Sequence, residues 1–175
     1  LEHQFICMNV TIEHVDSHGA DALALLREAV IDARALYPES FTDTAGPVTN
    51  EPLADRGVYV VAYVDGRPLA SGALRPLDES TAEVRRMYVH RAHRRTGLGR
   101  DVLEHLAREA VRLGYRRLVL ETGNRQQPAM RLYETCGFVR MAAFGEYVDD
   151  PTSVCYERVL VTTGLLDARP STDQR

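Results

Sequence analysis

A short segment rich in arginine and glycine, residues 94–100, is the part of the sequence most suited to chemistry. It reads R-R-T-G-L-G-R, and it follows a strand-like segment and precedes a helix-like one. Two glycines separated by one residue let a backbone fold closely around a ligand, and the first amides of a helix have no partner within that helix. The helix dipole and the arginine side chains add positive charge, so the segment predicts a diphosphate-binding site.

The same segment is compared with two other phosphate-binding patterns. A dinucleotide-binding turn would require a third glycine and an acidic residue about 20 positions later, and a P-loop would require Gly-Lys-Ser/Thr. Neither pattern occurs here. An ordinary strand-to-helix turn with solvated arginines remains a further alternative.

The elements that must position this segment follow from residue periodicity. Strand-like segments cover 4–14, 57–64, 68–74, 82–89, 117–121, 138–147 and 153–161, and helix-like segments cover 20–36, 97–113 and 128–136. The pair Asp65-Gly66 is typical of a tight hairpin turn, and residues 38–56 read as a loop with room for one helical turn. We expect an α/β (α+β) domain over residues 1–163, with a mixed sheet between helices and a disordered tail at 164–175.

Composition narrows the possible functions. The chain has 175 residues, of which 45% are hydrophobic and 26% are charged, with a net charge of −4. The acidic balance does not favour nucleic acid as a partner. No run of about 18 apolar residues predicts a membrane span, and no leader peptide is recognised. Three scattered cysteines and the close pair His90 and His93 match no disulfide or metal pattern, so we expect no metal and a cytoplasmic location.

Four motifs, in order and at the expected spacing, resemble the GNAT superfamily of acyl-CoA-dependent N-acetyltransferases. The segment A-E-V-R-R-M-Y-V (82–89) is similar to the family's fourth strand, and L-V-L-E-T (118–122) to its fifth. The segment 94–99 matches the diphosphate signature Arg/Gln-x-x-Gly-x-Gly/Ala, and P-A-M-R-L-Y-E-T-C-G-F (128–138) resembles the helix A-x-x-L-Y-x-x-x-G-F. The resemblance implies a mostly antiparallel sheet of about seven strands flanked by about four helices, with strands four and five splayed apart.

The resemblance also implies a binding site for acetyl-CoA between these two strands. Backbone groups of the fourth strand would hold the pantetheine arm, and amides of the glycine segment would hold the pyrophosphate. The residues implied are Met87, Tyr88, Val89, Arg94, Arg95, Thr96, Gly97, Leu98, Gly99 and Arg100. Many family members have Asn seven residues before the tyrosine, where this chain has Gln126, with Asn124 nearby.

Direct transfer to an amine requires a base for the ammonium proton and an acid for the leaving thiolate. The family places a tyrosine near the sulfur at the position of Tyr133, which predicts the acid; the alternative is a packing role in the core. A glutamate at the spacing of Glu83 serves as the base in the histone-acetylating branch; the alternative is a surface glutamate paired with Arg85 or Arg75. Glu121 is the reserve candidate for the base. The alternation of strand side chains predicts that Glu83, Arg85 and Met87 share one face. Cys136 is interpreted as a packing residue, so no acyl-enzyme is expected.

The acceptor pocket is predicted to form from the less diagnostic segments, which are the loop at 38–56, the strand pair near 59–75 and the segment 141–153. Arg75, Arg85 and Arg86 could hold a carboxylate, because guanidinium binds it in a bidentate manner, or they could be solvated. The aromatic residues expected to line the pocket are Phe144, Tyr147, Tyr63 and Tyr37. The prediction is an N-acetyltransferase acting on a small-molecule amine or amino acid, with the oligomeric state, including a homodimer, left open. The alternatives are a non-catalytic acyl-CoA-binding or sensing module and a nucleotide-binding redox domain.

Overall fold

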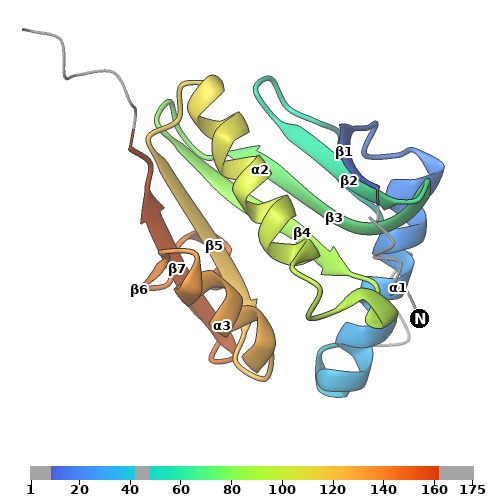
Figure 1. Cartoon of the computed structure of the whole chain (residues 1–175). Helices are drawn as coiled ribbons and strands as arrows, with labels where there is room; N and C mark the ends of the chain where they lie inside the picture. Colours follow the sequence, from blue (N-terminus) through green and yellow to red (C-terminus); the bar gives the residue numbers. More distant parts are fainter. Residues whose placement is uncertain (1–8, 42–47, 162–175) are drawn as a thin grey trace, which may run out of the picture.

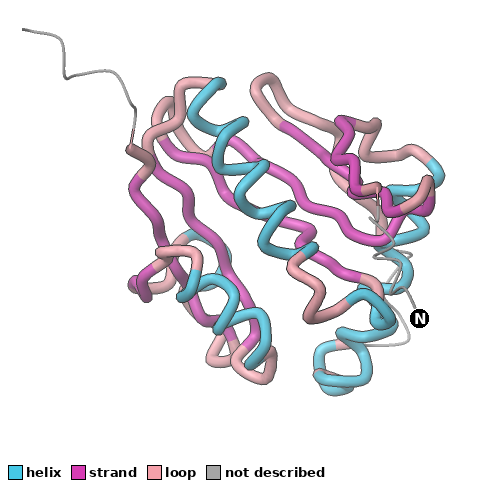
Figure 2. The backbone as a smooth tube through the Cα atoms, viewed as in Figure 1, coloured by secondary structure: helices cyan, strands magenta, loops and turns pink. Residues whose placement is uncertain are grey.

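The computed structural model describes residues 9–41 and 48–161, which form one seven-stranded sheet with helices on both faces (Figures 1 and 2). The strands lie in the order β1-β2-β3-β4-β5-β7-β6, and only β4 and β5 are parallel. The strands are β1 (Val10–His14), β2 (Val58–Val64), β3 (Arg67–Pro76), β4 (Thr81–Val89), β5 (Arg117–Gly123), β6 (Val139–Met141) and β7 (Ser153–Val159). The predicted mostly antiparallel sheet of seven strands is confirmed.

The described residues contain three α-helices, one fewer than expected. They are α1 (Ala20–Leu36), α2 (Leu98–Arg112) and α3 (Gln127–Thr135). Three single 3₁₀ turns accompany them at Pro38–Ser40, Arg91–His93 and Gly145–Tyr147. None of the described helices combines the length and the apolar character needed to cross a membrane.

The helices cover the two faces of the sheet unequally. Apolar side chains of α2 and α3 pack with β2–β5 in the larger core cluster, whereas α1 packs with β2–β4 in a smaller cluster on the opposite face. Figure 1 shows α2 and α3 in front of the sheet and α1 behind it. Gly72 on β3 lies beneath α2, where an added Cβ would come within 2.9 Å of side chains of Val102 and Leu106. The glycine therefore allows the close approach of α2.

A bulge interrupts the alternation of side chains along β4. Arg86 has a φ of +56°, and the register between β3 and β4 shifts next to it. Because of the extra residue, Met87 packs against the core beneath α2, while Glu83 lies on the face of α1. The expectation that Met87 shares a face with Glu83 and Arg85 was therefore wrong, since alternation holds only as far as the bulge.

The same part of β4 separates from β5. Parallel pairing joins only four residue pairs, from Thr81–Arg117 to Val84–Leu120, although both strands continue further. Beyond Val84, β4 remains paired with β3, and β5 remains paired with β7 as far as Gly123. The predicted splay of the fourth and fifth strands is confirmed, and it leaves a gap flanked by the N-terminus of α2 and by α3.

The C-terminal part of the sheet differs from the expected pattern. The predicted strand at 138–147 ends at Met141, and the chain then forms the turn Gly145–Tyr147. Gly145 has a φ of +52°, which a strand does not allow. The first part of the predicted strand 4–14, residues 4–8, and the whole of the tail at 164–175 lie outside the described residues.

Candidate active site

The glycine segment forms an open cradle at the start of α2. Gly97 is the N-cap residue, with a φ of +92°, and α2 begins at Leu98. No atom lies within 4 Å of the position that a Cβ of Gly97 would occupy, so the space above the first helical turn is free. Gly99 lies against Val89 and Leu132, where a Cβ would come within 3.3–3.4 Å of their side chains. The first turn of α2 thus lies beside the end of β4 and beside α3, and its first amides have no partner within the helix.

The arginines around the cradle play different structural parts. Arg94 donates from Nε to the carbonyl oxygen of Val89 (3.0 Å) and forms an ion pair with Asp32 of α1. Burial raises the pKa of Asp32, but hydrogen bonds from Arg91 and Arg94 outweigh this effect and lower it. Arg95 and Arg100 are exposed, and neither has an ion-pair partner among the described residues. Their charges are therefore available to a diphosphate, whereas the guanidinium of Arg94 anchors the loop to α1.

Tyr133 lies on α3 beside the gap and is 5% exposed. Its ring packs against Phe138 and Tyr156, with ring centroids 6.0 and 6.1 Å away. Burial raises the pKa of Tyr133, and the charge of Glu121 adds to this rise. Within residues 9–41 and 48–161, no hydrogen-bond partner of the Tyr133 hydroxyl is found. The group is a protonated phenol that could donate to a ligand.

Glu83 is the least accessible ionisable side chain of the site, at 1% exposure. Arg75, its cross-strand neighbour on β3, donates to Oε2 from Nε (2.9 Å) and Nη2 (2.6 Å). Tyr147 donates to Oε1 at 2.7 Å. Both carboxylate oxygens are therefore engaged, an arrangement that suits a structural anion better than a proton acceptor.

Glu121 on β5 has a different environment on the same face of the sheet. It accepts one hydrogen bond, from the hydroxyl of Ser153 (2.8 Å), and it has no ion-pair partner within 4 Å among the described residues. Burial raises its pKa, and the charges of Asp150 and Glu83 raise it further, against a lowering effect from Arg85. A carboxylate with a raised pKa and a free oxygen is well suited to accept a proton.

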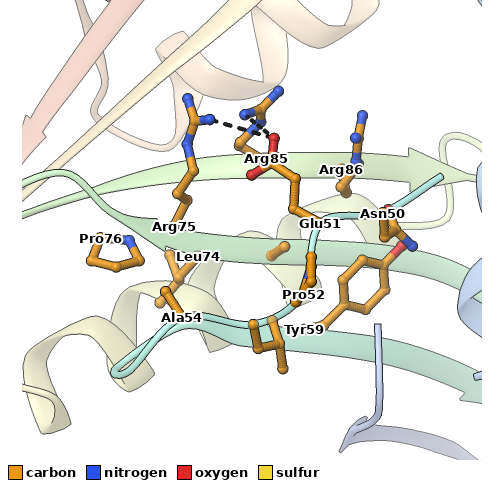
Figure 3. Close-up of a pocket in the computed structure, with 12 residues that line it drawn as sticks. Asn50, Glu51, Pro52, Ala54, Tyr59, Leu74, Arg75, Pro76, Arg85 and Arg86 are labelled. Atoms are coloured by element: carbon orange, nitrogen blue, oxygen red, sulfur yellow. Dashed lines mark ion pairs between the residues drawn. The ribbon is translucent and has the colours of Figure 1, made fainter. Parts of the chain in front are cut away.

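Next to these groups, a pocket opens between the segment at residues 50–54 and strands β3 and β4 (Figure 3). Arg75, Arg85 and Arg86 stand side by side at this pocket, and Glu51 reaches between the first two. Glu146, from the turn after β6, forms a second bridge to Arg75 at 3.0 Å and lies 3.7 Å from Arg85. The structure thus brings the predicted acceptor arginines together with Glu83 and Tyr147.

The remaining predicted aromatic residues have separate locations. Phe144 packs edge-on against Tyr147, with ring centroids 5.2 Å apart. Tyr63 instead donates to Asp21 of α1 (2.8 Å) and so contacts the helix rather than the pocket. Tyr37 follows α1, and its hydroxyl accepts a hydrogen bond of 2.7 Å from the backbone amide of Arg125. Arg125 lies between Asn124 and Gln126, so Tyr37 contacts the turn that precedes α3.

Sequence reasoning did not identify Glu51, Glu146 or Ser153. The acidic residues lie on irregular segments, and no periodicity indicates where such segments fold. The alternative considered for Glu83, a glutamate paired with Arg75 or Arg85, is confirmed for Arg75, although the side chain of Glu83 is buried rather than on the surface.

One group of side chains could hold a divalent cation in the described part of the chain. His14, His105 and Glu109 have candidate ligand atoms within 4.8 Å of one another, on β1 and α2. Glu109 already accepts hydrogen bonds from Arg112 and lies 3.3 Å from His14. The group lies outside the gap and the arginine pocket, and it adds nothing to their chemistry.

Comparisons with known proteins agree with this geometry. Residues 26–138 match the model of the acetyltransferase (GNAT) family. The uncharacterized N-acetyltransferase YsnE of Bacillus subtilis is 42% identical over 150 residues, which is 84% of this chain and 96% of that protein.

Two solved structures share the fold. A candidate acyl-CoA N-acyltransferase from Klebsiella pneumoniae has a TM-score of 0.71 and 28% identity, over 87% of this chain and 98% of that one. A GNAT family acetyltransferase from Elizabethkingia anophelis, solved with acetyl-CoA bound, has a TM-score of 0.63 and 18% identity, over 87% and 99% of the two chains.

Proposed function

Because the chain belongs to the acetyltransferase (GNAT) family, we propose that it transfers an acetyl group from acetyl-CoA to a primary amine. The acceptor is a small molecule or an amino acid, and the amine attacks the thioester directly. The observation that carries this proposal is the juxtaposition of three features: an open helix N-terminus, a gap between two parallel strands, and two proton-transfer candidates, the buried Tyr133 and the half-buried Glu121.

The residues present fit acetyl-CoA. The amides of Gly97, Leu98 and Gly99 lie at the start of α2, where the Cβ position of Gly97 is open, and they can receive a diphosphate with Arg95 and Arg100 nearby. The edge of β4 from Met87 to Val89 has no strand partner on the side of β5, so its backbone groups can pair with the amides of a pantetheine arm. When bound, acetyl-CoA supplies an activated thioester carbonyl carbon.

In the proposed reaction, Glu121 accepts a proton from the ammonium group of the acceptor, directly or through one water. The free amine forms the new C–N bond as the C–S bond breaks, and Tyr133 donates its proton to the leaving sulfur. The new amide nitrogen then loses its second proton, directly or through water, to the phenolate of Tyr133, and Glu121 returns its own proton to solvent. We assign the base to Glu121 rather than Glu83, because Arg75 and Tyr147 occupy both oxygens of Glu83. Groups of this kind contribute about 10²–10⁴-fold each to the rate.

Direct attack is favoured over an acyl-enzyme because the described cysteines are poorly suited to nucleophilic attack. Cys136 and Cys155 are buried. Burial raises the pKa of both thiols, which lowers the fraction of thiolate. The cysteines are therefore assigned to packing.

Two measurements on the full chain test the proposal. Calorimetric titration with CoA should show binding, and a panel of primary amines with acetyl-CoA should release free thiol with at least one acceptor. Binding of CoA without thiol release from any amine would instead identify a non-catalytic acyl-CoA-binding module. Binding of NADPH in preference to CoA would contradict both assignments.

A further inference from the structure

We propose that the pocket of Arg75, Arg85 and Arg86 binds the carboxylate of an anionic amine acceptor, and that Glu51 and Glu146 occupy the pocket until this acceptor binds. The inference rests on the proposed acetyl transfer and specifies its substrate class: a molecule that carries both a carboxylate and a primary amine.

The first argument is the state of Arg85. Its side chain is only 22% exposed, and its Nη1 is buried without a hydrogen-bond partner among the described residues. The nearest anionic atoms belong to Glu51, at 3.5 Å, and Glu146, at 3.7 Å, both beyond good hydrogen-bonding geometry. A buried donor without an acceptor is costly, so an incoming carboxylate would gain a charge-assisted hydrogen bond here.

The second argument is the contrast between three carboxylates around the arginines. Glu83 is fully buried, accepts two hydrogen bonds from Arg75 and one from Tyr147, and is a permanent part of the fold. Glu51 and Glu146 are each 60% exposed and lie on irregular segments. Exposed ion pairs contribute only about 0–1 kcal/mol, so these two side chains can be displaced at little cost.

The third argument is the balance of charge. Glu83 compensates one of the three guanidinium groups, and Arg86 makes only a long contact of 3.4 Å to the carbonyl oxygen of Thr49. If Glu51 and Glu146 turn outward, Arg85 and Arg86 remain side by side with no other compensating carboxylate within ion-pair distance among the described residues. Neighbouring like charges that are partly buried attract an anion.

The fourth argument is the position of the pocket relative to the proposed base. Glu83 pairs with Val119 in the parallel register, so Arg85 and Glu121 lie two residues further along β4 and β5, respectively. Arg85 affects the pKa of Glu121, as expected for side chains that extend from the same face of the sheet. A carboxylate on Arg85 would therefore leave the amine of a compact acceptor close to Glu121.

Matched acceptors test the substrate class. The probes are phenylalanine, phenylalaninamide and phenethylamine, with β-alanine, β-alaninamide and propylamine as a second set, each assayed by thiol release from acetyl-CoA. We expect kcat/KM to be at least 10-fold higher for the carboxylates than for the amides. Amine reactivity does not explain this preference, because an α-amino group next to an amide has a lower pKa and is more often in its free, nucleophilic form.

Two variants test the residues. Arg85→Met should raise the KM for carboxylate acceptors about 10–100-fold relative to the KM for neutral amines, the effect of losing a hydrogen bond to a charged group. Loss of the Arg85 charge also raises the pKa of Glu121, but this effect is shared by carboxylate and neutral acceptors and cancels in the ratio. Glu51→Gln combined with Glu146→Gln should lower the KM for carboxylates several-fold, about 3-fold or more, by removing the competing negative charges. Arg67→Met, at an exposed site at the opposite end of β3, is the matched control and should change neither value.

The outcomes separate this inference from the proposed function. Acetylation of neutral and carboxylate amines at equal rates, or a preference for neutral amines, would overturn the carboxylate site and leave the acetyltransferase assignment intact. An Arg85→Met variant with an unchanged KM for the carboxylates would also overturn it. Failure to acetylate any amine while CoA binds would contradict the proposed function itself.

Discussion

The hydroxyl of Tyr147 donates a 2.7 Å hydrogen bond to Oε1 of Glu83, while Arg75 covers Oε2 of the same carboxylate. A buried anion with every oxygen engaged organises its neighbours. Here it ties β3, β4 and the turn Gly145–Tyr147 together. The site therefore contains one acidic residue that maintains structure and a second, Glu121, whose setting is suited to proton transfer.

Glu83→Gln should accordingly act mainly on stability. Removing one partner of a fully buried ion pair costs about 3–5 kcal/mol, and because Arg75 is 30% exposed we expect a smaller loss of about 2 kcal/mol. Chemical denaturation measures this change, with the exposed Glu79→Gln as control. Unchanged stability together with a shifted pH–rate profile would instead make Glu83 the base.

Glu121→Gln should reduce turnover about 10²–10⁴-fold, because the proposed base is lost. In contrast to Glu83→Gln, this substitution should increase the stability of the fold. Burial raises the pKa of Glu121 in the folded state, so its ionisation opposes folding once the pH exceeds the unfolded pKa, and this penalty is absent in acid. Thermal denaturation should therefore show that the variant is more stable than the parent protein at about pH 8 and that the two proteins are equally stable at about pH 4.

The result would be contradicted by a Glu121→Gln protein that is fully active, or by one that is equally destabilised at both pH values. Ser153→Ala is the companion variant. It removes the hydrogen bond that lowers the pKa of Glu121, so the acidic limb of the pH–rate profile should move to higher pH.

Tyr133→Phe should lower kcat about 10²-fold or more with little change in CoA affinity, because only the proton donor is removed. The packing against Phe138 and Tyr156 is retained. Single-turnover kinetics and calorimetry measure the two quantities separately. Tyr156→Phe is a matched control, since Tyr156 lies in the same cluster but donates its hydroxyl to Glu134. Equal losses in both variants would point to packing rather than acid catalysis.

Gly97→Ala should weaken CoA binding about 10-fold through backbone strain at a φ of +92°, since L-residues in this region cost about 1–2 kcal/mol. Gly66 provides a close control. It has a φ of +78°, and no atom lies near its missing Cβ, as at Gly97. Gly66→Ala should lose similar stability and retain CoA affinity. Wild-type CoA affinity in Gly97→Ala would contradict the proposed cradle.

Gly123→Ala should destabilise the fold, because the new Cβ would lie 2.2 Å from the hydroxyl oxygen of Tyr37. Overpacking of this kind typically costs about 1–3 kcal/mol. In a double-mutant cycle with Tyr37→Ala, measured by denaturant unfolding, the combined loss should be smaller than the sum of the single losses. Strictly additive losses would show that Tyr37 does not cover Gly123 in solution.

Much of the architecture could be predicted from the sequence because local signals agreed with the fold. Asp65-Gly66 forms the expected turn, with positive φ at both residues, and Pro38 follows the end of α1. The bulge at Arg86 could not be predicted, because an arginine in the left-handed region carries no compositional signal. That single residue reversed the face of Met87 and left two neighbouring arginines at the same pocket.

The candidate site could be predicted in part, for a related reason. Residues within motifs, such as Gly97 and Tyr133, occupy positions fixed by their own helix. The engagement of Glu83 and the raised pKa of Glu121 depend on Tyr147, Ser153 and Asp150, which arrive from the irregular chain between β6 and β7. Such contacts depend on packing between segments that are distant in sequence, and the periodicity of residues along the chain gives no information about this packing.

The brief parallel pairing of β4 with β5 has a mechanical consequence. The sheet has two parts, β1–β4 and β5-β7-β6, and only four residue pairs join these parts within the sheet. A short junction therefore lies at the centre of the sheet rather than only at its edge. A ligand bound along this junction would contact both parts of the sheet and would couple their motions.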